Sequence, residues 1–460
     1  MMKRLMIVLM CIVLLLFGGC GINERPVDTT EAPVRESAPA RDTEAKLDGQ
    51  LDIYYLSETV STARNVVNKF ARSQSYIKIN ATAFESVEEM DQQITSDIMR
   101  GDGPDVILFP KNTQLDTAKL ALNGMFLDLS PMLQEDEAFL STNYYPVLDA
   151  GIIGDGQYLM PLRMEVLYMM TTQKRFESSL ALEDDYTLEQ LMQALAENAA
   201  WRNPDESAMH TMYSFDAYLY DLLRLTGVQL VDLAELKQTV DKATFLEYAQ
   251  FVRMAYGQCL SAAMQMRDYG TSNLGEMLRR NTVVLTSQSL PCNLRYFSSL
   301  YSGGLDEEIR LVTYPCQYNT GSLIADISLY AAVLSNSDNP QGAYNFVRYA
   351  MDFGFENINE QMPVCREGVD DLLAVLSGSQ GKTVVVNSQV VVVDKMSPER
   401  EEMCRNLLDR ITEGSISNGG LRRIVSDVMN AFVKGESEFE RCWEQFESET
   451  ECYLYELFED

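Results

Sequence analysis

The sequence predicts an α/β protein with two lobes. Segments typical of strands and helices alternate between residues 51 and 109, in the order strand, helix, strand, helix, strand. That order is typical of a doubly wound parallel sheet with right-handed crossovers. Roughly 410 residues follow a polar N-terminal stretch, which is more than one hydrophobic core usually holds, so we expect two lobes.

The first strand and helix are predicted from their apolar spacing. Residues 51–56 (LDIYYL) are a short apolar run bounded by polar residues, which is typical of a strand. Ser57 or Ser61 can cap the helix that follows, in which Val66 and Phe70 lie on one face.

The next three elements complete the alternating pattern. Residues 76–84 (YIKINATAF) alternate as a strand, and residues 87–99 place apolar side chains on one helical stripe. The sequence Gly-Asp-Gly-Pro at 101–104 ends this helix, and residues 105–109 (DVILF) read as a buried strand. The whole segment therefore predicts three parallel strands joined by two helices.

Ligands of such sheets bind beyond the carboxyl ends of the strands. This rule indicates Glu58 after the first strand, and Phe109 and Lys111 at the end of the third. The alternative for Glu58 is a solvated carboxylate at the start of a helix, where the helix dipole favours negative charge.

The N-terminus has the features of an export signal. Lys3 and Arg4 precede an unbroken apolar run, residues 5–17, which is shorter than the ~20 residues that span a membrane. Two glycines and Cys20 follow, and this ending resembles the lipobox of bacterial lipoproteins, although the family prefers Leu where Phe17 stands. The resemblance implies a signal peptide at 1–19 and acylation of Cys20, with palmitate among the expected chains. The alternative is an uncleaved anchor helix, and both place the rest of the chain outside.

Residues 20–48 are predicted to be a lipid-anchored flexible tether. They are rich in Pro, Thr, Ala and mixed charge and hold few large apolar side chains, so they cannot bury enough surface to fold. We therefore expect the protein to be lipid-anchored on the outer face of the cell membrane, in a Gram-positive host.

Composition excludes several functions. The net charge of −31 disfavours a nucleic-acid partner, because nothing basic is available to neutralise phosphates. The chain has a single histidine, His210, and lacks a Gly-x-Ser-x-Gly elbow, a phosphate-binding loop and a calcium loop. The cysteines beyond Cys20 are widely spaced with no Cys-x-x-Cys pair, which disfavours a structural zinc site. We therefore expect no catalytic residue, no metal ligand and no cofactor.

Six segments carry a resemblance to one large family. They are GDGPDVILF (101–109), NGMFLDLSPML (123–133), DGQYLMPLRMEVLYMMTTQKRFE (155–177), YTLEQLMQAL (186–195), NTVVLTSQS (281–289) and NPQGAYNFVRYAM (339–351). In this order they resemble the extracellular solute-binding proteins of ABC importers, family 1, sugar-binding type. The resemblance implies a two-lobed, type II periplasmic-binding-protein-like fold, in which each lobe is a mostly parallel sheet flanked by helices.

The resemblance also implies lobe boundaries. The N-terminal lobe is expected to comprise 49–162 and 296–350, and the C-terminal lobe 163–295 and 351–460. The chain is expected to cross between lobes near 161–163, 290–295 and 351. Residues 383–393 (TVVVNSQVVVV) depart from the family pattern and predict two strands about Asn387-Ser388, which leaves the segment 378–398 uncertain.

The resemblance implies binding residues just past the first crossing, at Arg163 and Glu165, and in a loop that sugar-binding members use, at Tyr213 and Asp216. Trp201 follows a helix expected in the second lobe, and Gln288 and Tyr318 are further candidates. Each has an alternative. Arg163 and Glu165 could form an internal ion pair that fixes the hinge, and Trp201 could be a packing residue instead of a platform for a sugar ring. Tyr213 could belong to the core, and the remaining assignments are weaker examples of the same kind.

The function implied is binding of a solute, expected to be a sugar or oligosaccharide, and its delivery to ABC permease subunits by hinge closure. We expect a monomer that is not an enzyme. The alternatives are a secreted carbohydrate-active enzyme, or a ligand sensor or adhesion lipoprotein without a permease.

Overall fold

The computed structural model describes residues 49–57, 62–74, 76–183, 186–197, 209–211, 215–269, 285–290, 308–315, 322–352, 361–378, 383–386, 389–392 and 396–457. The chain divides into two units, Met1–Lys46 and Leu47–Asp460. All of the described residues belong to the second unit. The predicted signal peptide and the whole of the predicted tether, including Cys20, lie outside them.

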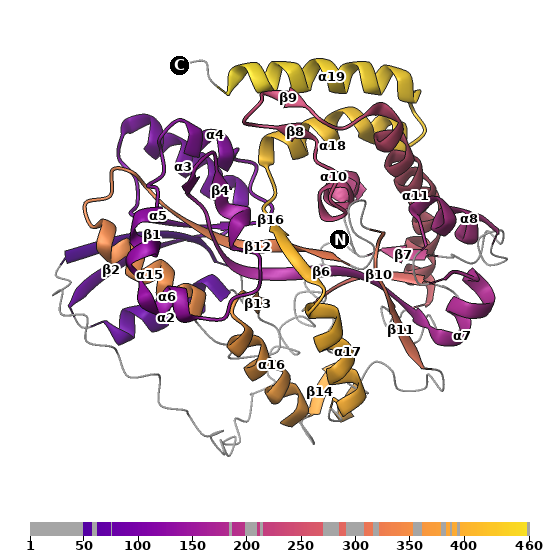
Figure 1. Ribbon diagram of the computed structural model, residues 1–460, viewed down its shortest axis with the longest axis horizontal. Coiled ribbons are helices and arrows are strands. Elements are labelled where there is room, and N and C mark those ends of the chain that lie inside the picture. Colours follow the sequence, from indigo (N-terminus) through magenta and orange to yellow (C-terminus); the bar gives the residue numbers. More distant parts are fainter. Residues whose placement is uncertain are drawn as a thin grey trace, which may run out of the picture. The chain divides into compact units, whose positions relative to one another are not determined.

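The N-terminal segment folds as its periodicity predicts (Figure 1). Strand β1 pairs in parallel with β2 on one side and with β3 on the other. The elements in chain order are β1 (Gly49–Leu56), α2 (Thr62–Ser73), β2 (Ile77–Phe84), α3 (Val87–Arg100) and β3 (Val106–Pro110). Ser86 caps α3 by accepting a hydrogen bond from the N–H of Glu89, and Gly101 ends it at a φ of 68°, which favours glycine.

The main sheet is mixed. Its strands lie in the order β2-β1-β3-β12-β6-β10-β7, with β11 and β13 paired to β6 and β16 paired to β12. The further strands are β6 (Met160–Thr172), β7 (Met209–Thr211), β10 (Leu285–Leu290), β11 (Ile309–Val312), β12 (Leu323–Val333), β13 (Met362–Pro363) and β16 (Ile411–Ser415). Strand β12 runs antiparallel to both β3 and β6, so the parallel pattern of the N-terminal segment stops at this strand.

Short elements follow β3. They are α4 (Thr117–Leu122), α5 (Ser130–Glu135), α6 (Glu137–Ser141), η1 (Leu148–Gly151), β4 (Ile152–Ile153) and β5 (Gly156–Gln157). Beyond β6 come α7 (Gln173–Arg175), η2 (Phe176–Leu180), α8 (Leu188–Glu197), α10 (Phe215–Leu225), β8 (Val231–Asp232), β9 (Lys237–Gln238) and α11 (Lys242–Tyr269). The C-terminal elements are α15 (Pro340–Asp352), α16 (Arg366–Gly378), β14 (Thr383–Val386), β15 (Gln389–Val392), α17 (Pro398–Leu408), α18 (Gly419–Val433) and α19 (Phe439–Glu456).

The buried side chains of the described residues form two hydrophobic cores. The first core gathers side chains from β1, β2, β3, α2, α3, α15, α16 and α17. The second gathers side chains from α8, α10, α11, α18 and α19, with an aromatic centre in which Phe446 packs against Phe245 and Trp443. Two separate cores agree with the expectation of two lobes.

Three strands connect the two cores. Alternate residues of β6 enter different cores: Val166 and Tyr168 belong to the first, and Leu167 and Met169 to the second. In β12, Ile324 belongs to the second core while its neighbours belong to the first. The chain passes a third time through β16, which leads from α17 to α18, and the three strands lie side by side because β12 pairs with both others (Figure 1).

The passages differ in part from the expected boundaries. The first expected crossing, residues 161–163, lies in β6. The second, 290–295, lies almost wholly outside the described residues. Met351, at the third, is buried in the first core near the end of α15, and the first core continues through Val369 and Cys404. The physical reason is that the apolar side chains of α16 and α17 are buried in the first core, so among the described residues the chain reaches the second core after β16, at α18. Tyr314, expected in the N-terminal lobe, packs in the second core.

The predicted hairpin of 383–393 is present in the structure. Strands β14 and β15 pair antiparallel, with Val386 opposite Gln389. The two residues between the strands, Asn387 and Ser388, lie outside the described residues.

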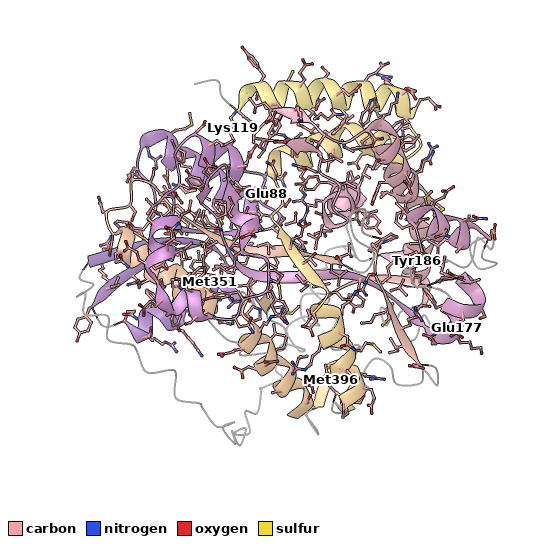
Figure 2. All side chains as sticks on the ribbon, viewed as in Figure 1. Glu88, Lys119, Glu177, Tyr186, Met351 and Met396 are labelled. Carbon is pink, nitrogen blue, oxygen red and sulfur yellow. The ribbon has the colours of Figure 1, made fainter. Side chains whose placement is uncertain are left out.

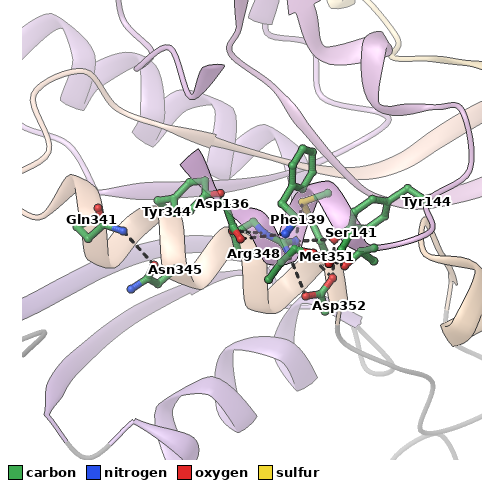
Figure 3. Close-up of polar contacts among 12 residues, drawn as sticks. Asp136, Phe139, Ser141, Tyr144, Gln341, Tyr344, Asn345, Arg348, Met351 and Asp352 are labelled. Atoms are coloured by element: carbon green, nitrogen blue, oxygen red, sulfur yellow. Dashed lines mark hydrogen bonds and ion pairs between the residues drawn. The ribbon is translucent and has the colours of Figure 1, made fainter. Parts of the chain in front are cut away.

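A polar cluster around Arg348 holds α6 and the residues after it against α15 (Figure 3). Arg348 donates from Nε to Asp136 Oδ2 at 2.9 Å and from Nη1 to the Tyr144 hydroxyl at 2.6 Å, and it pairs with Asp352 at 3.2 Å. Burial alone would raise the pKa of Asp136, but hydrogen bonds from the Phe139 N–H, Arg348 and a tyrosine hydroxyl outweigh it and lower the pKa. The cluster therefore keeps a buried guanidinium fully paired inside the first lobe.

Candidate functional site

Two of the predicted binding residues, Lys111 and Glu165, lie together where β3 ends beside the crossing strands. Lys111 Nζ donates to Glu165 Oε2 at 2.7 Å and to Asp326 Oδ2 at 3.1 Å. Glu165 on β6 and Asp326 on β12 are opposite one another in the strand register, so their side chains leave the sheet side by side. Strand-end position and strand pairing thus bring one ammonium group to two carboxylates.

Asp326 is the most buried charge at this place. Its side chain is 1% exposed, and its second oxygen, Oδ1, accepts a hydrogen bond from Arg224 Nη2 at 2.6 Å. Burial would raise the pKa of Asp326, but Arg224 and Lys111 overcome this effect and hold the pKa at about 2. The Asp326 carboxylate is therefore ionised at neutral pH. The free-energy cost of burying this charge is offset only because the carboxylate is paired with cations.

Arg224 is held on three sides. It donates to Asp221 from Nε at 3.0 Å and from Nη2 at 2.8 Å, and from Nη1 to the backbone carbonyl of Ser415 in β16 at 3.1 Å. Burial would lower the pKa of Arg224, but the negative charges of Asp326 and Asp221 raise it instead. The guanidinium thus joins α10 to two of the three crossing strands.

The loop after β3 is fixed by a second carboxylate. Asp91 of α3 accepts hydrogen bonds from the Thr113 hydroxyl at 2.7 Å and the Gln114 N–H at 2.8 Å. Burial raises the pKa of Asp91, although the two hydrogen bonds act to lower it. Anchoring of residues 113 and 114 limits the positions that Lys111 can reach.

The same loop contacts the second lobe directly. Asn418, which caps α18, donates from Nδ2 to Asp116 at 3.3 Å and to the Tyr453 hydroxyl at 2.9 Å. A Cβ at Gly419 would lie 2.5 Å from the Leu115 carbonyl oxygen, so only glycine allows this approach. Lys119, labelled in Figure 2, also lies 3.9 Å from Glu456 of α19.

Other predicted residues occupy different environments. Arg163 is buried, and its Nη1 donates to the backbone carbonyls of Leu162 and Ala350 at 2.7 and 3.0 Å, so it ties β6 to the end of α15. Phe109 is fully buried in the first core, with its ring stacked on Tyr330 at 5.5 Å. Phe109 lies on a central strand that is covered on both faces, so it supports the site from within the core in this arrangement.

The structure places the backbone of two more predicted residues. Gln288 lies on β10 opposite Tyr168 of β6, and Asp216 is the second residue of α10. Glu58, Trp201, Tyr213 and Tyr318 lie outside the described residues, so their predicted roles stay predictions.

Sequence reasoning missed Asp326, Arg224 and Asp221. A signal was present for each. Asp326 is the single charge in the apolar strand LIADISLYAAV, and Arg224 stands three residues after Asp221 in the apolar helix FDAYLYDLLRL. A charge inside an apolar element requires a partner, but the sequence does not say which element supplies it.

Neither a metal site nor a membrane span is found within the described ranges. There, no group of three or more His, Cys, Asp or Glu side chains could hold a metal ion. Over the same residues, no helix is long and apolar enough to cross a membrane.

Comparison with known proteins gives one family. A family model described as bacterial extracellular solute-binding protein matches residues 65–357, which is more than half of the chain. A search of curated proteins found no match.

Several solved structures share the fold. The sugar-binding protein MalE from Xanthomonas citri superposes with a TM-score of 0.60 at 12% identity, covering 88% of this chain and 98% of that one. The galacto-N-biose-/lacto-N-biose I-binding protein of the ABC transporter from Bifidobacterium longum gives a TM-score of 0.56 at 12% identity, covering 89% and 98%. An ABC substrate-binding protein from Listeria monocytogenes in complex with cycloalternan gives a TM-score of 0.56 at 13% identity, covering 89% and 99%. At these identities the likeness shows the fold, which confirms the predicted two-lobed α/β architecture.

Proposed function

The chain belongs to the family of bacterial extracellular solute-binding proteins, and from this premise we propose that it binds a carbohydrate and delivers it to an ABC importer. The solved structures of similar fold include proteins described as binding sugars and oligosaccharides, which supports a carbohydrate as the solute. The single observation that carries the proposal is the family match over residues 65–357 on a fold of two cores joined by three adjacent strands.

Hinge closure is the proposed mechanism. Three adjacent strands join the two hydrophobic cores, and such a connection is where lobes rotate. A solute that contacts both lobes favours the closed arrangement, because only that arrangement makes every contact. Membrane permease subunits would then recognise the closed form.

Solute contacts are proposed at the junction of the crossing strands. Lys111 and Glu165 supply an ammonium group and a carboxylate, which pair with sugar hydroxyls, and Trp201 supplies a flat apolar face for the C–H side of a sugar ring. Gln288, Tyr213, Asp216, Tyr318 and Glu58 are proposed as further contacts. We propose that Arg163 does not contact the solute and instead positions β6 by its hydrogen bonds to backbone carbonyls.

Anchoring to the membrane completes the proposal. Acylation of Cys20 after removal of residues 1–19 would hold the domain on the outer face of the cell membrane, with residues 20–48 as a tether. Two acyl chains on one cysteine would make this attachment stable.

Calorimetric screening tests the binding proposal. The full chain in detergent is titrated with neutral monosaccharides, disaccharides and oligosaccharides, and with amino acids and organic acids as other solute classes. We expect saturable binding of one carbohydrate class, a raised melting temperature, and at least tenfold weaker binding, about 1.4 kcal/mol, in Glu165→Gln and Trp201→Ala. Binding of an amino acid alone would overturn the carbohydrate assignment, and unchanged affinity in both variants would show that the proposed contacts are misplaced.

A further inference from the structure

One buried carboxylate is held by a cation from each lobe. Asp326 Oδ2 accepts from Lys111, which directly follows β3 of the first core, and Asp326 Oδ1 accepts from Arg224 of α10, which packs in the second core. Asp326 itself lies on β12, one of the strands that join the cores. Any rotation that separates the end of β3 from α10 must therefore stretch one of these two ion pairs.

The two cations that pair with Asp326, Arg224 and Lys111, differ in how many other contacts hold them and in how buried they are. The Arg224 side chain is 8% exposed and also contacts Asp221 and the Ser415 carbonyl, so its partners all lie on α10 and the crossing strands. The Lys111 side chain is 32% exposed and sits on a loop. Because the partly exposed Lys111 ammonium group regains some water when it leaves the carboxylates, whereas Arg224 would leave Asp221 and the Ser415 carbonyl as well, Lys111 is the cation that is released more easily.

Lys111 is also shared between two carboxylates with different roles. Both carboxylates lie within hydrogen-bond distance of Lys111 Nζ. The Asp326 side chain is 1% exposed and the Glu165 side chain 9%, so Glu165, the proposed solute contact, is the less buried of the two. A hydroxyl that donates to Glu165 competes with Lys111 for that carboxylate. Occupation of Glu165 therefore weakens the hold on Lys111 without touching Asp326.

We propose that Lys111 is a latch that couples the solute site to the hinge. When Lys111 pairs with both Glu165 and Asp326, it favours the arrangement of the two lobes described here. When Lys111 is released from Glu165, the crossing strands can adopt a different arrangement of the lobes. Asp326 acts as a positioning residue, since it orients Lys111 while Arg224 keeps its other oxygen occupied. The inference rests on the proposed function only for the identity of what displaces Lys111, because the latch itself is a property of the chain without solute.

The test measures the interlobe distance without any solute. Nitroxide labels are coupled to p-acetylphenylalanine at positions 78 and 444, which are exposed residues on β2 and α19, so the native cysteines are left alone. Distance distributions are recorded by pulsed electron paramagnetic resonance on the full chain in detergent. In Lys111→Met, we expect the odds of the wild-type distance against other distances to fall about tenfold, equivalent to about 1.4 kcal/mol.

Two further variants separate a latch from general damage. Glu165→Gln should shift the distribution in the same direction, and combining it with Lys111→Met should add little, because both remove one interaction. Lys242→Met is the matched control: its ion pair with Glu440 is exposed and joins α11 to α19 within the second lobe, so the distribution should not move. Melting temperatures are measured in parallel to exclude unfolding.

Distributions of Lys111→Met and Glu165→Gln that superpose on the wild type would overturn the latch. An equal shift in Lys242→Met would also overturn it, because any lost lysine would then produce the effect. These outcomes leave the solute screen unaffected, and a screen without any binding would contradict the proposed function while the distance shift still supported the latch.

Discussion

Acid should remove a defined part of the stability that depends on Asp326. The perturbation is to lower the pH from 6 to 3 and to compare the wild type with Asp326→Asn. The pKa of Asp326 is about 2 in the folded protein, against 3.8 for an ordinary aspartate side chain. Because the folded pKa is the lower one, the stabilisation is fully present above pH 4 to 5 and is lost as the pH falls toward 2.

The magnitude follows from the two pKa values. Each tenfold difference in proton affinity corresponds to about 1.4 kcal/mol, so ionisation of Asp326 stabilises the folded state by about 2 kcal/mol at pH 6. About half of this contribution is gone at pH 3, where the unfolded carboxyl is mostly protonated and the folded one is mostly ionised. Asp326→Asn cannot titrate, and it also loses the charge that pairs with Arg224 and Lys111.

The assay is urea unfolding of both proteins at several pH values between 6 and 3. The difference in unfolding free energy between wild type and variant isolates this single group from the many other acidic residues. We expect the difference to shrink by about 1 kcal/mol from pH 6 to pH 3. Asp155→Asn, which removes an exposed carboxylate at the turn between β4 and β5, should show a much smaller change. A difference for Asp326→Asn that stays constant over this range would refute the reasoning.

Four other outcomes are expected. Gly419→Ala should destabilise the protein by about 1–3 kcal/mol in thermal melts, because its Cβ would meet the Leu115 carbonyl; a neutral change would contradict that contact. Arg348→Met should cost about 3 kcal/mol in urea unfolding, since it leaves Asp136 without its cation, and a cost under 1 kcal/mol would show the cluster to be unimportant. Phe446→Ala should cost about 3–5 kcal/mol by the same assay, because the ring is fully buried among aromatic side chains. Cys20→Ala should abolish incorporation of an alkynyl palmitate analogue and release the protein from membranes, whereas retained labelling would exclude this cysteine as the acylation site.

The local sequence pattern predicted most helices and strands of the N-terminal segment, residues 49–110. Elements between residues 49 and 110 are visible in the sequence, because α2 and α3 each bury one apolar stripe, β3 is a continuous buried apolar run and the connections are short. The rule that ligands lie beyond parallel strand ends pointed to Lys111, and the resemblance pointed to Glu165. The two strands of the hairpin, β14 and β15, were also predicted, from two valine runs on either side of Asn387-Ser388.

Only the tertiary structure decided which charges meet. Lys111, Glu165, Arg224 and Asp326 come from a loop, two strands and a helix that are far apart in the sequence, and periodicity carries no information on such partners. The places where the chain crosses between the lobes were likewise not predictable. The side chains of α16 and α17 are buried in the first core, so the chain crosses at β16, which pairs with β12; this burial depends on residues far apart in the sequence. The sequence thus determined the individual elements and showed that Asp326, a charge in an apolar strand, requires a partner. Only the tertiary structure, in which two cores pack on three shared strands, determined that Lys111 and Arg224 are those partners.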